Sequence, residues 1–351
     1  MNTKEEIPMD DLLNRVHTSD IMSFLPLIED NSIDVIITDP PYFLDRMDDH
    51  WDDEKVASKK YLQTIQSLPA GMKFDKTKGK EFYDWYLKVS EGLFRVLKPC
   101  GFFFSFSSPR LYHRMACAVD DAGFEIRDMF MWLYTQNQPK AMSINHFIDK
   151  LKISQPEKDK IKYSFNGWKT PQIKSCFEPI VMAQKPSDDT YLQNMLKYEV
   201  GLMNINVKQG DNMHPSNVAT IDEICESIDK AFLVGKPQKK EKGAYNHHKT
   251  VKPLAICEYL ISLTAFSEKA IIFDPFAGSG TTLVAAKKLD KNFIGVDINQ
   301  KYVEITEMRL REVNSETVFG PFCGSGTTLL PENELQRNRV GYEINNVKII
   351  K

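Results

Sequence analysis

The chain has 351 residues, of which 42% are hydrophobic and 26% are charged, and its formal net charge is −3. These values are ordinary for a soluble globular protein, and any binding to a polyanion would have to rest on local clusters of positive charge. The longest apolar runs are too short to span a bilayer, no signal peptide is visible, and the six cysteines are scattered. We therefore expect a cytoplasmic protein with reduced thiols, no membrane partner and no metal site.

Strand-like and helix-like stretches alternate over the first 133 residues. The β-branched run Ile33–Thr38 predicts a strand that the following prolines end. Apolar residues at helical spacing predict a helix over Phe82–Leu97, and Gly101–Phe106 predicts a buried strand. The remaining expected elements are a short helix over Ala116–Gly123 and a strand over Ile126–Tyr134. This alternation predicts βαβ units and a mostly parallel sheet.

A polar stretch interrupts that alternation. It is rich in Lys, Asn, Gln and Ser, and only Glu178–Ala183 within it is predicted as a core strand. The alternation then returns as a helix from Val251 to about Phe266, a strand over Ala270–Phe273, a glycine-rich turn, a helix over Thr281–Leu289 and a strand over Phe293–Val296. The sequence thus predicts an α/β fold in four segments: 1–133, the insert 134–245, 246–312, and 313–351.

The glycine-rich turn is the first candidate site. A strand, then Gly278-Ser279-Gly280, then a helix lets the backbone approach a ligand closely at a helix N-terminus. Asp297 follows Gly278 by 19 residues, where dinucleotide-binding folds place the carboxylate that holds a ribose diol. The P-loop lysine and the full dinucleotide fingerprint are absent, so a nucleoside without a pyrophosphate fits better. A tight turn without a ligand stays open as an alternative.

The second candidate site is Asp39-Pro40-Pro41-Tyr42, directly after the first predicted strand. The two prolines remove two amide donors, and their carbonyls stay free to accept. A carboxylate and a carbonyl that accept both hydrogens of a conjugated amine would free the nitrogen lone pair for attack, and Tyr42 offers a face on which a base can stack. An ordinary turn after a strand is the alternative.

Taken together, these motifs resemble those of the DNA amino-methyltransferases, which methylate N6 of adenine or N4 of cytosine. Asp39–Tyr42 resembles the catalytic motif of that family, and Phe276–Thr282 resembles its cofactor loop. His248–Pro253 is similar to its H-P-T-x-K-P element, with Lys249 where proline is usual, and Gly167–Thr170 with Phe177–Ile180 resembles its G-W-x-T…E-P-I segment. Because the catalytic motif comes first and the cofactor loop last, the order is that of the permuted β group.

The resemblance implies a Rossmann-like, circularly permuted fold that uses S-adenosylmethionine, with an inserted DNA-recognition region. It implies that the strands before Asp39 and after Ala270 are neighbours in one sheet. The residues implied for catalysis are Asp39, Pro40, Pro41 and Tyr42. Those implied for cofactor binding are Asp20, His248, Thr250, Lys252, Asp274, Phe276, Ala277, Gly278, Ser279, Gly280, Thr281 and Asp297.

The resemblance also indicates the reaction and its partners. The target nucleotide of double-stranded DNA would be flipped out, and its amine would attack the methyl group directly. The aspartate at position 39 favours N6 of adenine; N4 of cytosine and a non-catalytic DNA-binding protein are the alternatives. A homodimer and a cognate restriction endonuclease stay open as partners.

Lysines within the insert and just after it are the candidate contacts to DNA phosphates, which would make binding salt-dependent. One cluster is Lys150, Lys152, Lys158, Lys160, Lys162, Lys169 and Lys174, and the other is Lys236, Lys239, Lys240, Lys242, Lys249 and Lys252. A solvated surface is the alternative for any single lysine.

The cofactor-loop segment Phe273–Leu283 recurs as Phe319–Leu329, at an offset of 46 residues. Gly320 replaces the aspartate of the first copy, and Pro331 falls inside the expected helix, which costs about 3 kcal/mol. We expect a degenerate repeat, either a decayed duplication or the remnant of a fused neighbour, and therefore only one active site.

Overall fold

The computed structural model describes residues 8–42, 76–134, 141–170, 173, 175–207, 215–217, 237, 239–242, 245–246 and 251–313. All of them belong to the first of two units into which the chain divides, Met1–Val318. The second unit, Phe319–Lys351, holds the repeated glycine loop and lies outside the described residues.

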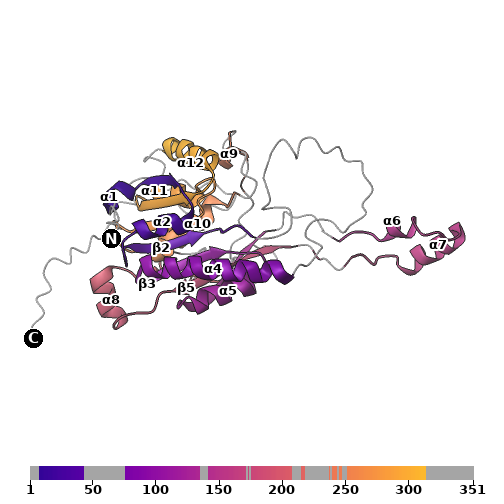
Figure 1. The fold of residues 1–351 in the computed structure, drawn as a ribbon, viewed down its shortest axis with the longest axis horizontal. Helices are drawn as coiled ribbons and strands as arrows, with labels where there is room; N and C mark the ends of the chain where they lie inside the picture. Colours follow the sequence, from indigo (N-terminus) through magenta and orange to yellow (C-terminus); the bar gives the residue numbers. More distant parts are fainter. Residues whose placement is uncertain are drawn as a thin grey trace, which may run out of the picture. The chain divides into compact units, whose positions relative to one another are not determined.

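The elements of the described residues are shown in Figure 1. The strands are β1 (Arg15–Thr18), β2 (Ile33–Thr38), β3 (Leu97–Phe106), β4 (Glu125–Leu133), β5 (Phe177–Gln184), β6 (Ile271–Asp274) and β7 (Asn292–Asp297). The helices are α1 (Met9–Leu12), α2 (Ile21–Phe24), the 3-10 turn η1 (Leu25–Leu27), α4 (Lys76–Val96), α5 (Tyr112–Asp121), α6 (Asn145–Ile148), α7 (Gln155–Ser164), α8 (Tyr191–Tyr198), α9 (Lys239–Lys242), α10 (Leu254–Thr264), α11 (Thr281–Lys288) and α12 (Gln300–Glu312).

Seven strands of the described residues form one sheet in the order β1-β7-β6-β2-β3-β5-β4. Within it, β5 runs antiparallel to both of its neighbours and the other pairings are parallel, so the mostly parallel sheet is confirmed. Strands β2 and β6 pair directly, with Val35 opposite Ile272 and Ile36 opposite Phe273. This pairing confirms that the strand before Asp39 and the strand before the glycine loop are neighbours.

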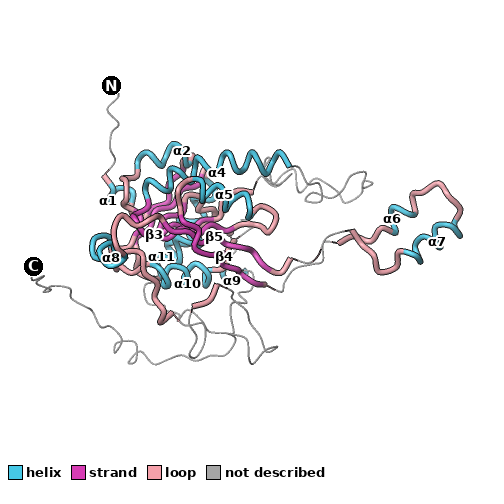
Figure 2. The backbone as a smooth tube through the Cα atoms, turned by 90° about the horizontal axis from the view of Figure 1, so that it is seen from below, coloured by secondary structure: helices cyan, strands magenta, loops and turns pink. Residues whose placement is uncertain are grey.

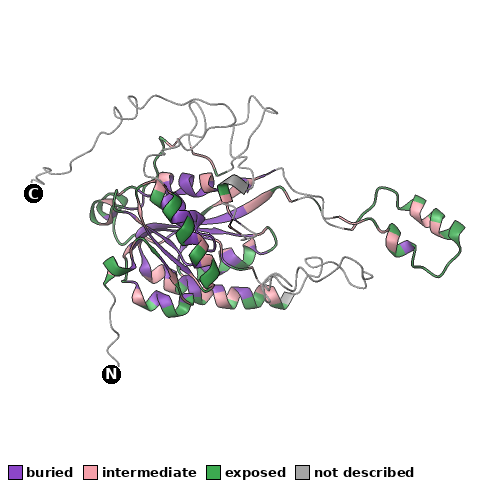
Figure 3. Cartoon of the chain, turned by 90° about the horizontal axis from the view of Figure 1, so that it is seen from above, coloured by how far each residue is buried: buried purple, intermediate pink, exposed green. Residues whose placement is uncertain are grey.

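Helices cover both faces of the sheet, as expected for a doubly wound α/β fold. Figure 2 shows α2, α4 and α5 on one side of the strands and α10 and α11 on the other. All six residues of β2 are buried, because a central strand is covered from both sides. In Figure 3 the central strands have the colour of buried residues, while the outer faces of the helices are exposed.

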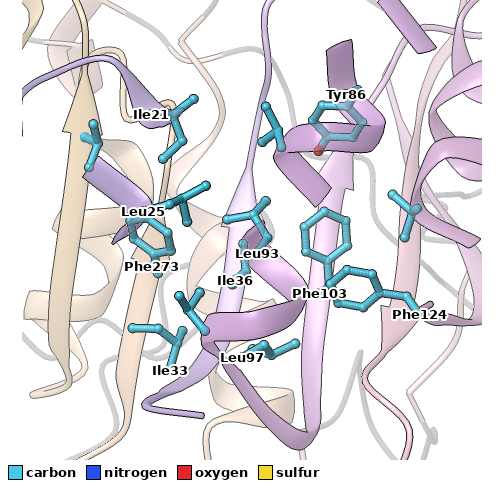
Figure 4. Close-up of a cluster of buried hydrophobic side chains, with 14 of the residues drawn as sticks. Ile21, Leu25, Ile33, Ile36, Tyr86, Leu93, Leu97, Phe103, Phe124 and Phe273 are labelled. Carbon is cyan, nitrogen blue, oxygen red and sulfur yellow. The ribbon is translucent and has the colours of Figure 1, made fainter. Parts of the chain in front are cut away.

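One hydrophobic cluster joins α4 to the sheet (Figure 4). Tyr86 and Leu93, one face of α4, are fully buried against Ile36 and Phe103. The Tyr86 hydroxyl lies 2.7 Å from the Ser105 hydroxyl, so its polar end is also satisfied. The apolar residues whose spacing predicted this helix therefore form the surface by which it packs on the sheet.

Several elements were not predicted from the sequence, among them β1, α7, α8 and α12. Strand β1 is only four residues long and alternates exposed and buried positions at the sheet edge. Helix α7 lies in the polar insert and has no buried residue; a capping box of Ser154 and Glu157 begins it. Such elements are stabilised by caps and tertiary neighbours, so their own sequences show only a weak hydrophobic periodicity.

No helix within the described ranges combines the length and the apolar composition needed to cross a bilayer.

Candidate active site at the carboxyl edge of the sheet

Four aspartates lie at or just beyond the carboxyl ends of four adjacent parallel strands, at one edge of the sheet. In sheet order β1, β7, β6, β2, they are Asp20, Asp297, Asp274 and Asp39. The carboxyl ends of parallel strands are where α/β sheets bind ligands. The edge therefore brings the two motifs together. Thr38, directly before Asp39, donates a hydrogen bond to Asp274, which lies 236 residues later in the chain and just before the glycine loop.

Asp39 is the first residue after β2 and is half-buried. The hydroxyl of Tyr42 donates a hydrogen bond of 2.8 Å to Oδ1 of Asp39. Burial raises the pKa of Tyr42 well above its usual value, and the carboxylates of Asp39 and Glu178 raise it further. The Tyr42 hydroxyl is therefore a permanent donor, and it occupies one oxygen of Asp39 in the absence of any ligand.

The other oxygen of Asp39, Oδ2, accepts from the ammonium of Lys252. Lys252 Nζ also lies 3.5 Å from Oε2 of Glu178, at the start of β5, and 5.3 Å from the centre of the Phe106 ring. Burial by itself lowers the pKa of the Lys252 ammonium, but the charges of Asp39 and Glu178 outweigh burial and the pKa is raised. Asp39, Lys252 and Glu178 thus form one charged cluster.

The glycine loop joins β6 to α11. Gly278 and Gly280 have φ values of +53° and +75°, a region that favours glycine. A Cβ on Gly280 would lie 2.3 Å from Cγ2 of Thr306, so that position also has no room for a side chain. The loop is tied to β7, because Gly278 N donates to Oδ2 of Asp297 over 2.8 Å and Ala277 N donates to the Val296 carbonyl.

Helix α12 supports the loop from behind with two buried polar side chains. The Thr306 hydroxyl donates to the Gly278 carbonyl over 3.0 Å. Nη1 of Arg309 donates to the Ser279 carbonyl over 2.6 Å and to the Thr281 hydroxyl over 3.1 Å. Burial lowers the pKa of Arg309. Sequence reasoning missed both residues; their signal was a polar pair on the same helix face as the buried Val303 and Leu310.

Asp274 lies underneath the loop and is 4% exposed. Its Oδ1 accepts from the Thr38 hydroxyl over 2.9 Å and from Phe276 N over 3.1 Å. Burial raises its pKa to about 7. In this structure Asp274 therefore shapes the turn and links it to β2.

Asp20 and Asp297 have structural partners as well. Asp20 is exposed, and its Oδ1 accepts from Met22 N at the start of α2. The two oxygens of Asp297 accept from Gly278 N and from Asn299 N, both over 2.8 Å. A carboxylate has about four acceptor positions, so either group can accept further hydrogen bonds from a ligand.

The remaining predicted site residues differ in their burial, and Pro41 is exposed. Pro40 is buried beside Asp39, and Ala277, Ser279 and Thr281 are buried in the loop. Phe276 is half-buried and its ring centre lies 5.6 Å from that of Trp85 on α4. His248 and Thr250 lie outside the described residues.

Part of the insert has its own internal structure. The backbone of Thr170 donates to the carbonyl of Met142, and a bridge pairs Ser143 with Lys169, so the ends of segment 141–170 are held together. Tyr163 is 82% exposed and Trp168 is 73% exposed, close in sequence to several lysines. Exposed aromatic rings among lysines are typical of nucleic-acid-binding surfaces.

Comparison with known proteins places the chain among enzymes of one kind. The family model described as DNA methylase, of the N6 and N4 type, matches residues 33–308. The type II methyltransferase M.HindIII of Haemophilus influenzae is 29% identical over 322 residues, which are 85% of this chain and 96% of that protein. The type II methyltransferase M2.DpnII of Streptococcus pneumoniae is 27% identical over 301 residues, which are 85% of this chain and 90% of that protein.

Among solved structures, the PvuII DNA methyltransferase, described as cytosine-N4-specific, matches with a TM-score of 0.51 at 16% identity. The match covers 86% of this chain and 88% of that one. It supports the Rossmann-like α/β fold expected from the sequence.

Proposed function

This chain belongs to the N6/N4 DNA methylase family, and we propose that it transfers a methyl group from S-adenosylmethionine to N6 of adenine in duplex DNA. Membership in the family supports the general activity, that of a DNA methyltransferase that uses S-adenosylmethionine. The choice of adenine and the roles of individual residues are our proposal.

One observation supports this function more than any other. Asp39 follows β2, the glycine loop follows β6, and these two strands are direct neighbours in the sheet. An amine held at Asp39 and a nucleoside held at the loop would therefore meet at the same edge. Reacting atoms need to approach within roughly 3–3.5 Å for efficient attack.

The chain's own residues have clear tasks in this scheme. Asp39 and the Pro40 carbonyl accept the two hydrogens of the target amine, and the Tyr42 ring stacks on the base. Because the Tyr42 hydroxyl occupies Oδ1 of Asp39, the amine has to replace that hydroxyl when the flipped base enters. No side chain forms a covalent intermediate, because the amine nitrogen is itself the nucleophile.

The donor set around the loop fits a nucleoside cofactor. The closely approachable backbone of Gly278–Gly280 would face it at the N-terminus of α11, and Asp297 would accept from its ribose hydroxyls. Asp20, two residues beyond β1, and the half-buried Phe276 would border its base. When bound, S-adenosylmethionine supplies an electrophilic methyl group on a sulfonium.

The choice between the two bases rests on the first residue of the catalytic motif. Asp39 resembles the family members that methylate adenine, and N4 of cytosine is the second candidate. A non-catalytic DNA-binding protein is disfavoured, because both motifs are intact and lie together at the sheet edge.

Recognition of the DNA sequence is assigned to the insert, residues 134–245. Within it, segment 141–170 offers exposed Trp168 and Tyr163 together with its lysines. A homodimer and a cognate restriction endonuclease stay open as further partners. The segment 313–351 would take no part in catalysis.

The test is incubation of plasmid DNA with the protein and isotopically labelled S-adenosylmethionine, followed by mass spectrometry of the nucleosides. We expect labelled N6-methyldeoxyadenosine, and we expect it to disappear with Asp39→Ala. Labelled N4-methyldeoxycytidine would contradict the choice of adenine, and the absence of both would contradict the proposed activity.

A further inference from the structure

Lys252 belongs to a motif that resembles a cofactor-binding element. In the structure, however, the ammonium of Lys252 contacts the carboxylate of Asp39, the proposed catalytic residue. Lys252 Nζ donates to Oδ2 of Asp39, and the lysine side chain is only 10% exposed. From this contact we infer that Lys252 is a positioning residue for Asp39, and that Glu178 in turn holds Lys252. The inference rests on the proposed function, because it concerns the same site.

The geometry explains why Asp39 needs such a partner. A carboxylate that follows the end of a strand can rotate about its side-chain bonds, and each lost orientation reduces the fraction of productive encounters. Lys252 takes Oδ2, so Oδ1 is the oxygen left for exchange between the Tyr42 hydroxyl and the target amine. One oxygen thus anchors the carboxylate while the other is available to the substrate.

Lys252 is itself held at several points. Its ammonium lies 3.5 Å from Glu178 and 5.3 Å from the centre of the Phe106 ring, and its backbone leads into α10 through Pro253. Burial of an ammonium is costly unless charges compensate it. Glu178 and Asp39 supply that compensation from β5 and from the end of β2.

The charge balance of the cluster supports a role for Glu178. Asp39 and Lys252 alone would be a neutral pair, whereas two carboxylates and one ammonium leave one net negative charge. As the nitrogen–carbon bond would form and the sulfonium–methyl bond would break, the positive charge would pass from the sulfur to the amine until the amine releases a proton to water. A negative cluster at that place favours the charge on the amine. Glu178 would therefore keep the pair both oriented and net negative.

The inference is tested with Lys252→Met in the full-length protein. We expect single-turnover methyl transfer to slow by about 100-fold, the size of loss typical of a misplaced reacting group. Binding of labelled S-adenosylmethionine, measured by equilibrium dialysis, should stay within about twofold of wild type. Lys252→Arg keeps the charge and should recover most of the rate.

Two further variants separate positioning from a general loss of structure. Lys252→Met leaves two carboxylates face to face, so Lys252→Met/Glu178→Gln should recover thermal stability without recovering the rate. Lys288→Met is the matched control, because Lys288 is also a shielded lysine paired with a glutamate, Glu258, over 2.6 Å. It should lower stability and leave the methyl-transfer rate unchanged.

A double-variant cycle shows whether Lys252 acts through Asp39. If it does, Asp39→Asn/Lys252→Met is about as slow as Asp39→Asn alone, because the partner is already lost. Additive losses, or an affinity for S-adenosylmethionine that falls in parallel with the rate, would overturn the inference. So would a wild-type rate in Lys252→Met. A wild-type chain that methylates no DNA would overturn the proposed function, and this inference with it.

Discussion

Nη1 of Arg309, on α12, lies 2.6 Å from the carbonyl oxygen of Ser279, at the centre of the glycine loop. The two residues are 30 positions apart, and both are buried. A guanidinium from α12 thus fixes a backbone carbonyl of the glycine loop.

Replacement of Arg309 should weaken cofactor binding without removing any residue from the ligand side. In Arg309→Met the Ser279 carbonyl and the Thr281 hydroxyl lose their shared donor, which costs about 1–3 kcal/mol for a buried unsatisfied group. We expect a lower melting temperature and a weaker affinity for S-adenosylmethionine in equilibrium dialysis. Arg311→Met on the same helix is the control, since Arg311 is 77% exposed and pairs with Glu307 on the same helix. Equal affinities in both variants would contradict the support role.

Gly280→Ala should destabilise the fold more than the same substitution at Gly167, a glycine with a similar φ. Gly280 and Gly167 have φ values of +75° and +85°, so alanine meets a similar backbone penalty of about 1–2 kcal/mol at each. Only at Gly280 would the new Cβ also lie 2.3 Å from Thr306, whereas nothing lies within 4 Å at Gly167. Urea unfolding should therefore show a clearly larger loss of unfolding free energy for Gly280→Ala. Equal losses would mean that Thr306 moves away at no cost.

The Tyr42 ring and its hydroxyl should have separable effects. In Tyr42→Phe the ring stays, and Oδ1 of Asp39 loses the donor with which the amine would compete. We expect a methyl-transfer rate equal to wild type or higher. Tyr42→Ala removes the stacking surface and should cost about 1–3 kcal/mol, or 5- to 150-fold, in the flipped complex. Single-turnover rates and the fluorescence of 2-aminopurine at the target position measure both effects. A Phe variant as slow as the Ala variant would show that the hydroxyl, and not the ring, is needed.

Asp274 should make the protein less stable as the pH rises towards neutrality. Burial raises its pKa from 3.8 to about 7 in the folded chain. Between those values the folded state binds more protons than the unfolded state, so the free energy of unfolding falls with increasing pH. Asp274→Asn removes this titrating group. The stability of the variant relative to wild type, measured as the free energy of unfolding, should therefore be higher near pH 8 than near pH 5. Asp120→Asn, at an exposed position of α5, is the control and should leave the slope unchanged.

Much of this molecule follows from local sequence patterns. The β-branched run of β2 and the apolar spacing of α4 predict buried elements, because burial is what selects those residue types. The prolines after Asp39 mark a strand end because they lack the amide donors that a strand needs. The glycines around Ser279 mark another, because they adopt the positive φ values of the turn. The pairing of β2 with β6 was also predicted, from the resemblance to a permuted family.

Other features depend on contacts between distant segments. Strand β1 and helix α12 have only weak hydrophobic periodicity in the sequence. Strand β1 is stabilised by its place in the sheet, and α12 by its contacts with the glycine loop. Asp20 and Asp274 were predicted as cofactor contacts, and the structure adds a helix cap for the first and a turn-shaping role for the second. Their contact with the cofactor stays a prediction.

The sequence by itself determined the two motifs to which we assign the chemistry, Asp39–Tyr42 and Phe276–Gly280, at the ends of two strands. Only the tertiary structure decided what supports those motifs, namely Lys252 and Glu178 at Asp39 and Thr306 and Arg309 behind the glycine loop. The physical reason is range. A backbone requirement for glycine or proline is local and is therefore written in the residue type, whereas an ion pair or a buried hydrogen bond exists only once folding brings two remote side chains together.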